Sequence, residues 1–297
     1  MPDFGAAERR ICSYFSAGTE VVINGRKWVV KESGKPTCPQ GEPKTDIFAL
    51  LSDGTRDVGL KISYKKENAD FLENKTNAER AEQLFGADWR SIVKTCTESI
   101  EELFAHRYLV YKNRFQRTEK GAITLGWKFE LLNKPGGDLS GQMNLTPQQV
   151  YDVYAGTNLS ADKKNAYVNG RIIPNSGVAD FILMTDGVSS AQDVINKLKS
   201  IKNYIRLHPN IYFACKALNY RTFARKYDGN RPLAVQVDWA IVNGMLTPKL
   251  AFDKPLERNG DEMAKNLLNC LKQLNITSTD DINERNADMH KVFDKPA

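Results

Sequence analysis

Residues 42–66, EPKTDIFALLSDGTRDVGLKISYKK, are the part of the sequence that indicates the fold most clearly. They predict one strand over residues 45–51 and a second over 58–65, with a turn at Asp53 and Gly54. Asp-Gly between two apolar runs is a strong hairpin signal, because such turns need residues that tolerate positive φ. The segment therefore predicts a β-hairpin.

The second strand of this hairpin has one apolar face and one polar face, because successive side chains of a strand point to opposite sides. The polar face carries Lys61, Ser63 and Lys65, and the hairpin brings Asp46 from the first strand close to it. A carboxylate that holds a hard cation and a lysine that steadies a water or a phosphate charge are the minimum for metal-assisted phosphodiester hydrolysis. An ordinary amphipathic strand with solvated lysines would show the same alternation.

The same residues resemble the core of the PD-(D/E)xK nuclease superfamily, which includes restriction and phage endonucleases. The segment PKTD, ending at Asp46, stands for the first half of the motif, with two residues inserted between Pro43 and the aspartate. The strand ISYKK, from Ile62 to Lys66, stands for the second half and is similar to a phage-type variant. Ser63 replaces the family's second carboxylate, so another acid or a water must complete the metal shell.

The resemblance implies a mixed α/β fold with a restriction-endonuclease-like sheet flanked by helices. It also implies a Mg²⁺-dependent DNA endonuclease, a hydrolase in which Mn²⁺ substitutes for Mg²⁺. Asp46 is then the metal ligand, and Ser63 bonds a water of the metal. Lys65 orients or deprotonates the attacking water or stabilises the transition-state charge, and Lys61 and Lys66 contact phosphates.

The acid that replaces Ser63 has several candidates. In the resembled family an acid on the preceding helix sometimes joins the metal site, and residues 3–16 predict a helix that carries Glu8. Glu20 and Glu42 are further candidates. The helical pattern after residue 66, which we expect Gly86 to break into two helices, offers a last group: Glu79, Glu82 and Gln83. For each of them taken singly, the sequence favours an ordinary place on the protein surface.

A second stretch repeats the pattern of the hairpin's first strand. Residues 177–187, GVADFILMTDG, again run from a carboxylate through apolar residues to Asp-Gly. Asp180 with Lys216 is therefore a rival active site, although the residue two before Lys216 is Ala214 rather than an acid. The alternative is a core strand that ends in a turn, and the sequence favours it.

Positive charge is concentrated in two stretches of a chain whose net charge is +6. Residues 107–120 hold five basic residues and one acid, and residues 201–232 hold seven basic residues and one acid, with aromatic residues interleaved in both. Basic groups for phosphates and rings for bases are typical of a nucleic-acid surface. We expect double-stranded DNA as the partner, contacted by Arg114, Arg117, Arg221, Arg225, Lys226 and Arg231.

Composition narrows the class of protein further. The 297 residues include five dispersed cysteines and three dispersed histidines, so a disulfide framework or a zinc site is not expected. No apolar run is long enough to span a bilayer, and we expect no membrane association and a place in the cytoplasm of a bacterium or phage-infected cell. A break at residues 134–137 predicts a catalytic core over 1–134 and a basic α/β part with additional β-hairpins over 135–297, unless the two form one domain.

Two other functions fit the same sequence. A nucleic-acid-binding protein without catalysis on a nuclease-like scaffold would explain Ser63 as a lost carboxylate. An interaction protein whose basic stretch binds an acidic protein would explain the charge alone. If the chain is a nuclease that makes two cuts with one type of active site, a homodimer is expected.

Overall fold

The computed structural model describes residues 4–39, 41–74 and 76–296 and divides the chain into two compact units. Unit 1 combines Met1–Asp70 with Leu145–Asn210, and unit 2 combines Phe71–Asn144 with Ile211–Ala297. This division differs from the single boundary expected at residue 134. Its cause is a parallel strand pair in unit 1, which requires the chain to return there after residue 144.

Unit 1 is built on a six-stranded mixed sheet with the order β1-β2-β3-β4-β11-β12. The strands are β1 (Glu20–Ile23), β2 (Arg26–Gly34), β3 (Ile47–Ser52), β4 (Asp57–Lys65), β11 (Phe181–Met184) and β12 (Lys199–Ser200). Strands β1 to β4 form an antiparallel meander, so the predicted hairpin over residues 45–65 is confirmed. Strand β11 then pairs with β4 in parallel, with Met184 opposite Lys65.

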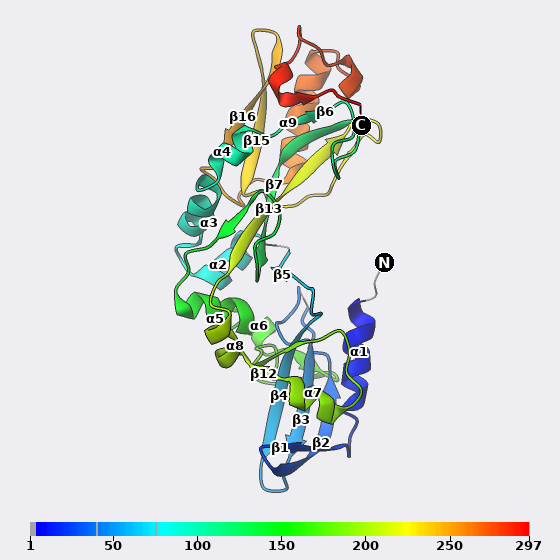
Figure 1. The fold of residues 1–297 in the computed structure, drawn as a ribbon, viewed down its shortest axis with the longest axis vertical. Helices are drawn as coiled ribbons and strands as arrows, with labels where there is room; N and C mark the ends of the chain where they lie inside the picture. The colour runs from blue at the N-terminus through cyan, green and yellow to red at the C-terminus, as the bar shows by residue number, and fades with distance from the viewer. Residues whose placement is uncertain (1–3, 40, 75, 297) are drawn as a thin grey trace. The chain divides into compact units, whose positions relative to one another are not determined.

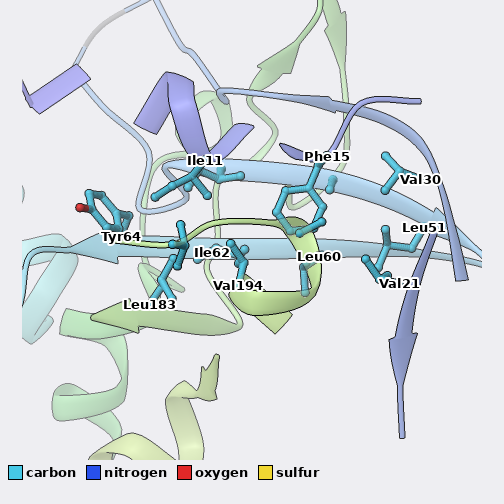
Figure 2. Packing of buried hydrophobic residues seen from close by; sticks show 14 of the residues in the cluster. Ile11, Phe15, Val21, Val30, Leu51, Leu60, Ile62, Tyr64, Leu183 and Val194 are labelled. Atoms are coloured by element: carbon cyan, nitrogen blue, oxygen red, sulfur yellow. The ribbon is translucent and has the colours of Figure 1, made fainter. Parts of the chain in front are cut away.

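One face of this sheet is covered by α1 (Phe4–Tyr14) and α7 (Ala191–Lys197). Helix α1 accounts for most of the helix expected over residues 3–16, of which residue 3 lies outside the described residues. Figure 2 shows Ile11 of α1 and Phe15, the residue after α1, above the sheet with Ile62 and Leu183 from β4 and β11. Because these side chains are at most 3% exposed, their burial fixes the helix on the sheet.

The other face of the sheet carries the short helix α8 (Ile201–Leu207) near β11. Tyr204 of α8 donates its hydroxyl to the Met184 sulfur at 3.1 Å, and its ring meets Tyr154 of α5 (Pro147–Ala155) at 5.3 Å. Thr146 begins α5 with a capping box that it forms with Gln149. Helix α6 (Ala161–Lys164) and the pair β9 (Tyr167–Val168) and β10 (Arg171–Ile172) complete unit 1. Helices on both faces of a mixed sheet confirm the mixed α/β class.

Unit 2 is organised around a nine-stranded sheet whose main run is β14-β13-β7-β15-β16 (Figure 1). That run contains β14 (Lys226–Tyr227), β13 (Tyr212–Arg221), β7 (Ala122–Leu132), β15 (Val235–Val242) and β16 (Met245–Ala251). Shorter strands pair at its sides: β5 (Phe71–Glu73), β6 (Val110–Tyr111), β8 (Ser140–Gln142) and β17 (Val292–Phe293). The hairpins β13–β14 and β15–β16 are the additional hairpins expected in the C-terminal half.

The helices of unit 2 are α2 (Ala78–Phe85), α3 (Trp89–Glu98), α4 (Glu101–Ala105) and α9 (Gly260–Gln273). Gly86 ends α2 with a φ of 77°, which is where the sequence predicts a break between two helices. Two single-turn 3₁₀ helices, Thr279–Asp281 and Met289–Lys291, precede the C-terminus. Within the described residues of both units, no helix has the length and apolar character needed to cross a bilayer.

Candidate active site at the start of β3 and the end of β4

Asp46 lies directly before β3, where its backbone and side chain both bind the end of β4. Its N–H donates to the Ile62 carbonyl at 2.9 Å, and its Oδ2 accepts the Tyr64 N–H at 2.7 Å. The Ser63 hydroxyl also donates to Oδ2, at 3.4 Å. The structure therefore brings together Asp46 and Ser63 as the hairpin predicts, and a backbone N–H fixes the orientation of the carboxylate.

Lys65 is the last residue of β4 and acts electrostatically on Asp46. Burial raises the pKa of the Asp46 carboxyl above its usual range, and the charge of Lys65 is the strongest opposing influence. Among the described residues Lys65 forms no ion pair. Lys65 is thus a cation that faces one buried carboxylate and remains available to a ligand, which is what its predicted role requires.

Glu8 of α1 is the acid that the fold brings to this site. The negative charge of Glu8 raises the pKa of Asp46 further. Glu8 also forms a 2.6 Å ion pair with Lys35, and the positive charge of Lys35 lowers the pKa of Asp46. Burial lowers the pKa of the Lys35 ammonium. The contacts with Glu8 and the negative charges of Asp46 and Glu42 raise this pKa, and the net shift is upward. Glu8 and Glu42 therefore share one electrostatic environment with Asp46. Lys35, on the loop after β2, is a charged member of this candidate site that the sequence analysis missed.

The other proposed acids lie elsewhere. Glu20 forms a 2.7 Å ion pair with Lys27 on the β1–β2 hairpin. Glu79 lies on α2 in unit 2, where its Oε1 accepts a hydrogen bond of 2.9 Å from Gln83, and Glu82 lies on the same helix. Within unit 1, Glu8 is the predicted acid that the packing of a helix on the sheet delivers.

The carboxylates near Asp46 can be compared with the ligands that Mg²⁺ prefers. Mg²⁺ is held in proteins by one or two carboxylates and several waters. Asp46 and Glu8 supply two carboxylates, and a cation between them would relieve the repulsion that raises the pKa of Asp46. No group of three or more acid, histidine or cysteine side chains able to hold a metal occurs among the described residues. The described residues therefore show no assembled metal centre at Asp46.

Lys61 and Lys66, the two lysines expected to contact phosphates, differ in their surroundings. Lys61 points from β4 to Asp180, with an ion pair of 3.0 Å, and its backbone carbonyl accepts the Asp180 N–H at 3.1 Å. Lys66 follows the end of β4 and is half-buried. Lys61 is thus neutralised in part by the acid of the rival site.

The rival site does not assemble within either unit. Asp180 belongs to unit 1, where it pairs with Lys61, whereas Lys216 belongs to unit 2. There Lys216 forms a 2.9 Å ion pair with the buried Glu130 and lies 4.0 Å from the centre of the Phe71 ring. Each partner of the rival pair therefore has a structural role of its own.

The basic stretch over residues 201–232 is divided between the units. Its first ten residues, with Lys202 and Arg206, belong to unit 1, and the remainder belongs to unit 2. In unit 2, Arg221 pairs with Glu119 and, at 2.8 Å, with Asp228. Five of the predicted DNA contacts remain exposed in unit 2: Arg114, Arg117, Arg225, Lys226 and Arg231.

Comparison with protein-family models, with curated proteins and with solved structures found no match for this chain.

Proposed function

We propose that this protein is a metal-dependent DNA endonuclease of the PD-(D/E)xK type, with its active site at Asp46. The proposal rests on one observation. Charged groups from two other elements, Glu8 on α1 and Lys65 at the end of β4, act on the buried Asp46 carboxyl that precedes β3. Buried carboxyls with a raised pKa and a specific charged neighbour are characteristic of catalytic sites.

Each residue has a distinct part in this proposal. The Tyr64 N–H and the Ser63 hydroxyl hold Asp46 in one orientation, so its second oxygen is left for a ligand. Lys65 balances the developing charge on the phosphate or holds the attacking water by a hydrogen bond. A bound Mg²⁺ would polarise the phosphate and lower the pKa of a water near Asp46 and Glu8. Duplex DNA is the proposed substrate because the exposed basic residues of unit 2 suit a polyanion.

Nicking of supercoiled plasmid in Mg²⁺ or Mn²⁺ tests the proposal. Asp46→Asn and Lys65→Met should each lower the rate by about 100-fold or more, because each removes a charge that acts in the transition state. The matched controls are Asp57→Asn and Lys31→Met. These residues form an exposed 3.0 Å ion pair that joins β4 to β2 away from Asp46, and their loss should leave nicking unchanged. Activity that survives both site substitutions would refute this assignment.

Metal binding gives a second readout that does not depend on activity. Glu8→Gln should weaken Mn²⁺ binding, measured by electron paramagnetic resonance, because it removes one of two carboxylates near the cation. Glu20→Gln is the matched control, since Glu20 was an equal candidate in the sequence and pairs with Lys27. Equal Mn²⁺ affinity in the two variants would remove Glu8 from the site.

A nucleic-acid-binding protein without catalysis is the second candidate. It is favoured by the observation that the described residues contain no group of three acids able to hold a metal. This function predicts salt-sensitive DNA binding that needs no metal, together with an intact plasmid after prolonged incubation in Mg²⁺ and in Mn²⁺.

A further inference from the structure

Two basic stretches that are far apart in the sequence meet in unit 2. Strand β13 runs antiparallel to β7, with Arg221 opposite Ala122, so the turn after β13 lies beside the segment that enters β7. Thr222 fixes this contact, because its N–H and its hydroxyl donate to the Gly121 carbonyl at 2.8 and 3.1 Å. Figure 1 shows β6, the start of β7 and the end of β13 at the same end of unit 2.

Phe223 stands at the tip of this turn and is 66% exposed. Its ring borders Gly121, where an added Cβ would lie 3.0 Å from Cδ1 of the ring. A phenylalanine left in water forgoes about 1.5–3 kcal/mol of burial free energy. The turn is also strained, since Arg225 has a φ of 48°, in the left-handed region that non-glycine residues rarely adopt. The turn therefore presents an aromatic ring to solvent from a backbone conformation that is uncommon for non-glycine residues.

Unpaired cations accompany the ring. Arg225 and Lys226 follow it on the turn, and Arg114 and Arg117 belong to the stretch that leads into Gly121. All four are exposed, and none forms an ion pair within the part of the chain that the structure describes. Arg221 differs, since it is neutralised by Glu119 and Asp228. We call these four cations and Phe223 the hairpin-tip surface.

We propose that the hairpin-tip surface binds DNA at an unpaired or unstacked base, with the Phe223 ring against the base and the four cations on flanking phosphates. The choice of DNA rests on the proposed nuclease function, whereas the preference for a disrupted stack rests on Phe223. Aromatic rings stack on exposed bases regardless of sequence, and cations fix the backbone around them. An acidic protein would engage the four cations without requiring the ring.

Fluorescence anisotropy of the full-length protein in EDTA at low salt tests this proposal. Two labelled duplexes of equal length are compared, one fully paired and one with a single bulged 2-aminopurine. The wild type should bind the bulged duplex more tightly, and stacking should quench the 2-aminopurine. Phe223→Ala should lower the affinity for the bulged duplex by about 5-fold to 100-fold and abolish the quenching, with little change for the paired duplex.

Two further variants separate stacking from charge. Arg225→Gln should weaken binding of both duplexes equally and reduce the salt slope by about one. Leu103→Ala is the control, because Leu103 is a 45% exposed apolar residue on α4 beside two glutamates and should affect neither duplex. Equal binding of the two duplexes by the wild type, or an unchanged preference in Phe223→Ala, would overturn the proposal.

The design also separates this inference from the proposed nuclease function. Binding in EDTA needs no cleavage, so a protein that prefers the bulged duplex but never nicks DNA would support the hairpin-tip surface and refute the nuclease. A protein that nicks plasmid through Asp46 but binds both duplexes equally would do the reverse.

Discussion

Gly177 holds the chain that delivers Asp46, and its replacement by alanine is the sharpest test of how the site is built. Its carbonyl accepts the N–H groups of Lys44 and Thr45 at 2.9 and 3.2 Å, and its own N–H donates to the Lys164 carbonyl at 2.9 Å. An added Cβ would lie 1.8 Å from the Lys163 carbonyl oxygen and 2.9 Å from the Pro43 Cβ. Real Cβ contacts under 3.0 Å essentially do not occur, so the backbone must move.

The magnitude follows from that movement. Forcing a methyl into packed structure costs about 1–3 kcal/mol, and each weakened hydrogen bond adds about 1 kcal/mol. Gly177→Ala should therefore destabilise unit 1 by about 2–4 kcal/mol, measured by urea unfolding followed by circular dichroism. Because Thr45 directly precedes Asp46, a displacement near 1 Å should also slow plasmid nicking about 100-fold.

Gly187→Ala is the matched control for this prediction. Gly187 also belongs to unit 1 and has no atom within 4 Å of an added Cβ, so alanine should be neutral or stabilise by up to about 1 kcal/mol. If Gly177→Ala is as stable and as active as Gly187→Ala, the close approach of these chain segments does not position Asp46, and the reasoning fails.

Three other predictions follow from the core, the site and a helix start. Phe15→Ala should cost about 3–5 kcal/mol because the ring is fully buried, whereas Val22→Ala, at a half-exposed position, should cost little in the same urea titration. Burial raises the folded-state pKa of Asp46, so the folded protein keeps the Asp46 proton to higher pH than the unfolded chain does. Without metal, the free energy of unfolding should therefore fall as the pH rises through the folded-state pKa. Asp46→Asn should remove this decline in Tm measured in EDTA, and an identical pH profile in wild type and variant would contradict the assignment. Thr146→Ala should lower stability by about 1 kcal/mol in thermal unfolding by removing the N-cap of α5, while Thr146→Ser should preserve it.

Local chemistry in the sequence determined most of the individual elements. Asn24 with Gly25 and Asn243 with Gly244 adopt positive φ in tight hairpin turns, because few other residue pairs tolerate that conformation. Alternation along β4 likewise placed Lys61, Ser63 and Lys65 on a face distinct from the core residues Leu60 and Ile62. Turns and alternation depend on neighbours in the chain, which is why a single sequence suffices for them.

The prediction that the chain is helical directly after residue 66 was wrong at its start. Residues 71–73 form β5, which pairs with β7, and helix begins only at Ala78. Helix propensity over so short a segment is worth little against pairing with a strand that is distant in the sequence. The boundary expected at residue 134 differs from the observed units for a similar reason, because the pairing of β11 with β4 brings the chain back into unit 1.

What the sequence by itself determined is the hairpin that places Asp46 beside Ser63, because strand pairing across a short turn fixes those distances. Only the tertiary structure decided which acid joins them. Glu8, Glu20 and Glu42 were equivalent in the sequence, and the packing of α1 on the sheet brought Glu8, with Lys35, into the electrostatic environment of Asp46. It also assigned Asp180 and Lys216 to different units. Contacts between distant segments depend on how whole elements pack, and no local pattern encodes that packing.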